Sequence, residues 1–199
     1  MRLLLDIGRE LLAALVFLIP FFLIWNKAVL HDGRKCGIYL LFAIYLAAVY
    51  YLVGLPNVTY ARFEWNLNWI PFRDMAGDLR STLLNVALFL PLGVFLPLCW
   101  EDLREGRKTI LYGFGVSVFV EFLQIFTLRA TDVNDLITNT LGTALGLLLA
   151  NILRKWIPAL HKLSDQTSQI ERQLLMAITF GTMFFLHPFS SLLLWRLCT

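Results

Sequence analysis

The sequence has few charged residues, few cysteines and no motif for binding phosphate or zinc. Asp, Glu, Lys and Arg make up 16% of the 199 residues, whereas hydrophobic residues make up 58% and the mean hydropathy is +0.69. These values exclude a soluble globular domain and predict an integral membrane protein. The three cysteines lack metal-ligand spacing. The 17 Lys and Arg are scattered along the chain, which gives nucleic acid no support as a partner.

Five or six apolar segments are long enough to span a membrane, for which about 17 to 25 residues are needed. The candidate spans lie at 5–24, 37–55, 81–100, 109–126, 133–156 and 174–197. The sequence therefore predicts an all-α fold, a polytopic helical bundle in the membrane. We divide it into an N-terminal hairpin at 1–56, a core at 57–156, and a polar connection with a last helix at 157–199. Asp6 and Glu10 interrupt the first apolar run and no cleavage site follows, so we interpret it as a retained span.

The stretch 57–80 is too polar to span, and it predicts an interfacial or re-entrant segment. Between residues 63 and 69, apolar and polar residues alternate with a period of two, which is typical of an extended strand. Pro71 biases Ile70 toward an extended conformation. The tryptophans suit an aromatic belt at the membrane surface, and the alternative interpretation is a cap over a polar cavity.

Helical spacing places polar and small residues of two consecutive spans on one face each, within an arc of roughly 80°. The residues on these faces are Gly113, Ser117, Glu121 and Gln124 in one span, and Asp132, Asp135, Asn139, Gly142 and Gly146 in the next. The last two glycines form the GxxxG spacing of closely packed membrane helices, so we predict that they are packing residues. Carboxylates are costly near hydrocarbon unless they are paired or hydrated, so their clustering predicts a site.

The alternation of spans brings this site to one side of the membrane. The stretch 57–80, the end of the span at 109–126 and the start of the span at 133–156 all lie on that side. Loops on the opposite side carry more Lys and Arg, which favours the cytoplasm for them. We therefore expect a multi-pass protein of the cell membrane, with this predicted polar site on the extracytoplasmic side.

Four short motifs occur in order along the chain: NLNWIPF at 66–72, NVALFLPLGVFLP at 85–97, EFLQ at 121–124 and RATDVNDLITNTLGTALG at 129–146. Together they resemble the VanZ-like family of bacterial membrane proteins, over roughly residues 60–156. The resemblance implies a polytopic membrane protein that contributes to low-level resistance to the glycopeptide teicoplanin, without an established reaction. Motif residues that carry over by position are Asn85, Pro91, Gly93, Glu121, Gln124, Arg129, Asp132, Asp135, Asn139 and Gly142. An extra residue separates Asn68 from the Pro-Phe pair, which leaves Asn66 and Asn68 as alternative counterparts of the family's Asn.

Two hypotheses follow for the site. In the first, Glu121, Asp132 and Asp135 act as acid, base or ligand carboxylates, at which a divalent cation is an option and no other cofactor is evident. The binding residues would be Asn68, Asn85, Gln124, Arg129 and Asn139. The partners would be membrane lipids and a lipid-linked envelope precursor or a surface polymer.

In the second hypothesis the protein is a non-enzymatic lipid- or envelope-binding protein, and the cluster is a structural lock between helices. Arg129 would then pair with Asp132 or Asp135, and Glu121 would bond to Asn139 or Gln124. A transporter is less favoured because no repeated half is visible. His187 lies inside the last span, and we interpret it as hydrogen-bonded to a neighbouring helix because no second His or Cys is spaced to join it on a metal. Whether a reaction is catalysed, and the oligomeric state, stay open.

Overall fold

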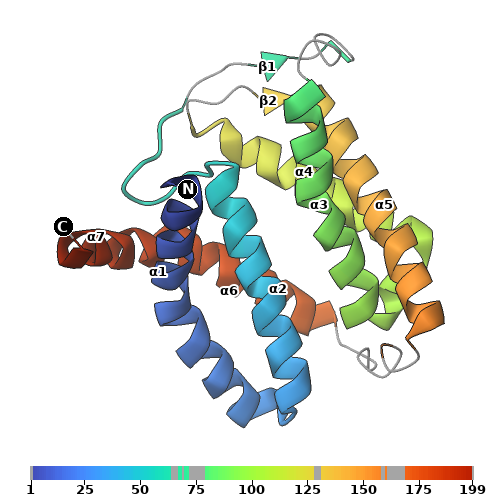
Figure 1. The fold of residues 1–199 in the computed structure, drawn as a ribbon, viewed down its shortest axis with the longest axis horizontal. Coiled ribbons are helices and arrows are strands. Elements are labelled where there is room, and N and C mark those ends of the chain that lie inside the picture. Colours follow the sequence, from blue (N-terminus) through green and yellow to red (C-terminus); the bar gives the residue numbers. More distant parts are fainter. Residues whose placement is uncertain are drawn as a thin grey trace. The chain divides into compact units, whose positions relative to one another are not determined.

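The computed structural model describes residues 2–63, 67–68, 70–71, 79–127, 131–157, 160 and 169–198. In this part of the chain the regular elements are helices and one pair of two-residue strands (Figure 1). Five helical segments are long and apolar enough to cross a membrane. They are Leu5–Leu30, Gly33–Leu52, Leu79–Cys99, Val133–Trp156 and Gln169–Arg196. The predicted all-α, multi-pass fold is therefore confirmed.

The chain forms two compact units, each of which packs around its own helices. Unit 1 comprises Met1–Ala61 with Ser168–Thr199, and unit 2 comprises Arg62–Thr167. The division at residues 56 and 156 that we drew from the sequence stays a prediction.

Unit 1 is built from the first two spans and the last one. Its elements are α1 (Arg2–Trp25), the π-helical η1 (Asn26–Leu30), α2 (Gly33–Leu52), α6 (Gln169–Gly181), the π-helical η4 (Thr182–Leu186) and α7 (His187–Cys198). Helix α2 packs against α1 and α6, and α7 packs against α1. Asp32 caps α2 by accepting hydrogen bonds from the backbone N of Arg34 and Lys35, at 2.8 and 3.2 Å. Lys35 also forms an ion pair with Glu171, at 2.8 Å, which ties α2 to α6.

Unit 2 holds the remaining elements. They are β1 (Leu67–Asn68), α3 (Leu79–Cys99), the 3-10 helix η2 (Glu101–Arg104), α4 (Gly106–Gln124), β2 (Thr131–Asp132) and α5 (Val133–Trp156). Helices α3 and α5 start at the same end and run side by side (Figure 1). Helix α3 is continuous through Pro91 and Pro97. Of the stretch 57–80, residues 64–66, 69 and 72–78 lie outside the described residues, so the predicted extended backbone is seen at β1.

Glycines bring the backbones of α3 and α5 together. A Cβ on Gly142 would overlap the carbonyl oxygen of Val86, and one on Gly146 would overlap that of Leu90. On the other helix, a Cβ on Gly93 would overlap the carbonyl of Thr143. The interpretation of Gly142 and Gly146 as packing residues is therefore confirmed, and Gly93 is a third such residue.

Helix α4 is not among the five apolar segments, because Arg107, Lys108 and Glu121 lie within its 19 residues. Nevertheless, α3 and α5 run in the same direction, so the chain must return between them along α4. Nineteen helical residues reach about 28 Å, close to the roughly 30 Å of a hydrocarbon core. If α3 and α5 both span the membrane, α4 must therefore be a sixth crossing.

Candidate functional site

A short parallel strand pair joins β1 to the residues just before α5. Strands β1 and β2 pair with Leu67 opposite Thr131 and Asn68 opposite Asp132. This register lets Nδ2 of Asn68 donate to Oδ2 of Asp132 at 3.0 Å. The backbone N of Arg62 also donates to the carbonyl of Phe126 at 2.9 Å, just beyond the end of α4. Arg62 and β1 are thus held beside the polar ends of α4 and α5.

Asp132 connects three parts of the site. Its Oδ1 accepts from the backbone N of Asn134 at 2.8 Å, which makes Asp132 the N-cap of α5. Its own backbone N donates to Oε2 of Glu121 on α4 at 3.1 Å. Thr131 adds a second tie, from Oγ1 to the carbonyl of Glu121 at 3.1 Å. The end of α4 and the start of α5 are therefore fixed to each other through Glu121.

Glu121 is buried, with 4% of its surface exposed, and a neutral amide lies beside it. With its amide nitrogen turned toward Glu121, Gln124 lies 3.2 Å from both carboxylate oxygens and donates to them. Gln124 is buried as well. Hydrogen bonds from neutral donors reduce the cost of placing a carboxylate away from water. The predicted pairing of Glu121 with Gln124 is present.

Asp135 receives a donor from α3. Nδ2 of Asn85 donates to its Oδ1 at 2.7 Å, and both residues are half-buried. Asn85 lies near the start of α3 and Asp135 in the first turn of α5. We call the six residues of this region the polar cluster. Its members are Asn68, Asn85, Glu121, Gln124, Asp132 and Asp135.

Asn139, the other alternative partner for Glu121, lies one turn beyond Asp135 on α5 and contacts a different residue. Its Nδ2 donates to Oγ of Ser117 on α4 at 3.0 Å, rather than to Glu121. Asn139 is 3% exposed, and its Oδ1 has no hydrogen-bond partner among the described residues. Arg129, the remaining predicted binding residue, lies outside the described residues. The catalytic and binding roles of all eight predicted residues stay predictions.

The described carboxylates do not form a metal centre by themselves. No group of three His, Cys, Asp or Glu within the described ranges is placed to hold a metal ion. Each of the three carboxylates instead accepts a hydrogen bond from an amide or backbone N–H. Such an arrangement can receive further hydrogen-bond donors, such as hydroxyl or amine groups, because a carboxylate offers about four lone-pair sites.

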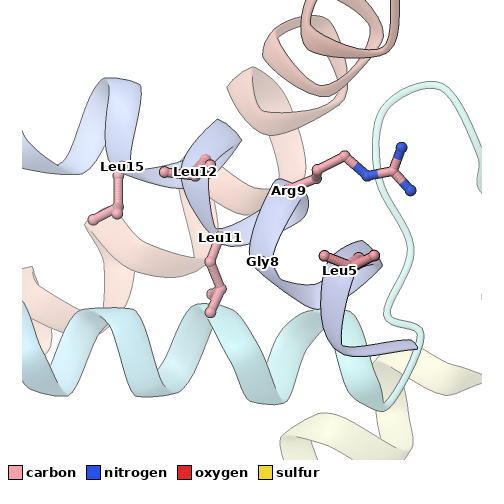
Figure 2. Close-up of a pocket in the computed structure, with 6 residues that line it drawn as sticks. All are labelled: Leu5, Gly8, Arg9, Leu11, Leu12 and Leu15. Atoms are coloured by element: carbon pink, nitrogen blue, oxygen red, sulfur yellow. The ribbon is translucent and has the colours of Figure 1, made fainter. Parts of the chain in front are cut away.

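A groove of about 470 Å³ lies along α1 in unit 1 (Figure 2). Its described lining is Leu5, Gly8, Arg9, Leu11, Leu12 and Leu15, none of which belongs to the predicted site. Figure 2 shows the guanidinium of Arg9 extending away from Leu12 and Leu15. A surface lined by leucines on a candidate span is suited to lipid chains rather than to acid-base chemistry.

Sequence reasoning missed a second polar group, which joins α1 to α7. Glu10 and His187 lie 3.0 Å apart, between Oε2 and Nε2. The interpretation of His187 as hydrogen-bonded to a neighbouring helix is confirmed, but its partner was not identified. The available signal is Glu10, a carboxylate inside the apolar run of the first span.

Two comparisons with known proteins agree on one family. The family model described as VanZ/LLP1 matches residues 42–154, which is more than half of the chain. A curated protein from Enterococcus faecium named Protein VanZ is 32% identical over 121 residues, covering 58% of this chain and 74% of that protein. No solved structure matches the chain significantly. With its apolar helices, this chain is a multi-pass membrane protein that belongs to the VanZ/LLP1 family.

Proposed function

We propose that this protein contributes to low-level resistance to glycopeptide antibiotics such as teicoplanin, including lipoglycopeptides, in the cell membrane. In this proposal the polar cluster binds or acts on a cell-envelope component at the outer face. The likeness to Protein VanZ and the motif residues in the cluster support it. The outer face is favoured because the loops at the opposite ends of the spans carry more Lys and Arg.

One observation carries the proposal: three carboxylates, from the end of α4, from β2 and from the first turn of α5, accept hydrogen bonds from N–H donors at one end of unit 2. Asp132 and Asp135 are half-buried. The two oxygens of Asp132 each accept one described hydrogen bond, so each has a further lone pair for a ligand donor. Hydroxyl-rich or amine-bearing head groups of a lipid-linked envelope precursor or surface polymer have this chemistry.

The experiment is the substitution Asp135→Asn in cells that carry the protein. Asn keeps an Oδ1 that can accept from Asn85, so the contact to α3 can persist while the charge is lost. We would measure teicoplanin susceptibility, the amount of protein in the membrane, and the Tm of the purified variant. The matched control is Glu105→Gln, which removes a carboxylate at the other end of α4, where Glu105 pairs with the exposed Lys108. A site role predicts that Asp135→Asn restores susceptibility at unchanged abundance, whereas Glu105→Gln leaves resistance intact.

A second candidate is a structural lock in a non-enzymatic protein that binds lipid or an envelope component. The observation that favours it is that Asn68 and Asn85 each bond to a carboxylate of a different element. Removing one partner of a buried hydrogen bond costs about 1–3 kcal/mol, which can remove folded protein. In that case Asp135→Asn lowers abundance and Tm together with resistance. Unchanged resistance at unchanged abundance would contradict a ligand role for Asp135.

A further inference from the structure

The end of unit 2 opposite the polar cluster carries an excess of positive charge. It is formed by η2, the start of α4 and the end of α5 (Figure 1). Five basic and three acidic residues are described there, which gives this end a net charge of +2. They are Arg104, Arg107, Lys108, Arg154 and Lys155, with Glu101, Asp102 and Glu105. Basic groups at the end of a membrane helix attract anions.

The acidic residues of this end serve its neighbouring cations. Glu101 pairs with Arg104 at 3.3 Å, and Glu105 pairs with Lys108 at 2.7 Å. Asp102 interacts electrostatically with Lys108. Three cations therefore have no ion pair within the described ranges, namely Arg107, Arg154 and Lys155.

Arg104 and Arg154 hold two guanidinium groups near enough for their charges to repel each other. The packing of α4 on α5 explains why they meet. A Cβ on Gly106 would lie 3.5 Å from Cδ2 of Leu147, two turns before Arg154 on α5. Both arginines are half-buried, so water screens their repulsion less than it does at an open surface. An anion between the two groups would offset this repulsion.

The guanidinium of Arg154 also has a donor to spare. Its Nη2 donates to Oδ1 of Asn151 on the same helix. Its Nε is buried and has no hydrogen-bond partner among the described residues. A guanidinium carries five N–H donors in a planar fork that fits two oxygens of a phosphate. A phosphate oxygen would thus satisfy a donor of Arg154 that is otherwise unpaired.

The position of this end favours the phosphate of a phospholipid over a free ion. Trp156 ends α5 and is 78% exposed, and tryptophan is enriched where a helix leaves the hydrocarbon. Exposed apolar residues continue from Arg107 along one face of α4. They are Leu111, Phe114 and Val118, at helical spacing. The basic end therefore lies at the level of the lipid head groups, with a face for acyl chains beside it.

We propose that the basic end of unit 2 binds the head group of an anionic phospholipid, with the phosphate between Arg104 and Arg154. The net charge of +2 favours an anionic head group over a zwitterionic one. On the topology expected from the Lys and Arg distribution, this end lies in the cytoplasmic leaflet, which is the leaflet that carries a negative surface potential. This site is separate from the polar cluster and does not depend on the function proposed for it.

The test measures lipid binding by the purified protein in an uncharged detergent. Short-chain phosphatidylglycerol, phosphatidylcholine of the same chain length and inorganic phosphate are added in separate titrations. A lipid that binds the folded protein raises the Tm, and the dependence on concentration gives an apparent Kd. We expect phosphatidylglycerol to raise the Tm saturably at concentrations at which the other two have little effect. Equal effects of phosphatidylcholine, or of inorganic phosphate, would overturn the assignment to an anionic lipid.

Substitutions locate the site. Arg154→Gln should weaken the binding of phosphatidylglycerol about tenfold or more, because charged hydrogen bonds to the phosphate are lost. Arg154→Lys keeps the charge but not the planar fork, so its affinity should lie between those of wild type and Arg154→Gln. The matched control is Arg34→Gln, which removes one exposed positive charge from α2 in unit 1 and should leave the affinity unchanged. Equal weakening by Arg34→Gln and the Arg154 variants would show a response to net charge alone and overturn the proposal.

Discussion

Asn85 of α3 donates from Nδ2 to Oδ1 of Asp135 on α5 at 2.7 Å. A neutral amide of α3 thus pairs with a carboxylate of α5. The two helices touch again about two turns deeper, where Gly93 lies against Thr143. The polar contact therefore lies at the open end of an interface that backbone packing already fixes. Its role in stability and its role toward a ligand can be measured separately.

A double-mutant cycle on Asn85→Ala and Asp135→Ala measures the energy of this contact. A hydrogen bond to a charged group contributes about 1.5–3 kcal/mol, so we expect each single variant to be destabilised by roughly that amount. The coupling energy should be positive and about 0.5–3 kcal/mol. Unfolding by SDS titration from detergent micelles, followed by tryptophan fluorescence, gives the four free energies. A coupling near zero would show that the contact does not stabilise the fold.

Gly93→Ala should destabilise unit 2, whereas Gly115→Ala should not. A Cβ at Gly93 overlaps backbone atoms of Thr143 and Leu147, which cannot move aside without separating α3 from α5. Overpacking of this kind costs about 1–3 kcal/mol or more. Gly115 lies within α4 with no heavy atom within 4 Å of an added Cβ, so Ala there should be neutral or stabilise by up to about 1 kcal/mol. Similar losses of stability in both variants would contradict the close packing of α3 on α5.

Helical periodicity predicts much of this architecture, because it determines which residues share a face. The span at 133–156 begins and ends where α5 does, and the glycines on its inner face pack as expected. Periodicity does not determine how far one helix is shifted along another. For that reason the sequence leaves Asn139 and Gln124 as alternative partners of Glu121, while Asn139 contacts Ser117, one turn deeper on α4.

Contacts between segments far apart in the sequence were also beyond prediction. The alternation at 63–69 predicts an extended backbone, but it does not specify the parallel register that places Asn68 opposite Asp132. The pairing of Glu10 with His187 joins the first and last spans. Each residue was visible as a polar group in an apolar run, but nothing in either run specifies its partner.

We expect Asp132→Ala to be less stable than Asp132→Asn, and both variants to lose teicoplanin resistance. Asp132 caps α5 through the backbone N of Asn134, and loss of an N-cap costs about 0.5–2 kcal/mol. Asn is as good an N-cap as Asp, so it should restore most of that stability. If the carboxylate acts on a ligand, both variants should still lose teicoplanin resistance. If Asp132→Asn is resistant while Asp132→Ala is susceptible, Asp132 acts only as an N-cap. The two variants must be compared at equal abundance in the membrane.

Ser117→Ala should destabilise the protein, and adding Asn139→Leu should recover part of the loss. Alanine at 117 leaves the buried Nδ2 of Asn139 without its acceptor, which costs about 1–3 kcal/mol. Replacing both partners by apolar groups removes that cost, since no buried donor is then left unpaired. SDS titration of the single and double variants measures the recovery, and a double variant no more stable than Ser117→Ala would contradict it.

The same double variant separates packing from ligand binding at this depth. Oδ1 of Asn139 is buried and has no partner among the described residues, so a bound hydroxyl or a water molecule would satisfy an acceptor that is otherwise unpaired. If the pair serves packing alone, the double variant should be resistant to teicoplanin at wild-type levels once its abundance matches. If Oδ1 holds part of the ligand, resistance should fall although the fold is recovered. The control is Ser117→Ala, which keeps Oδ1 of Asn139. If Oδ1 contacts the ligand, Ser117→Ala should give more resistance per folded molecule than the double variant.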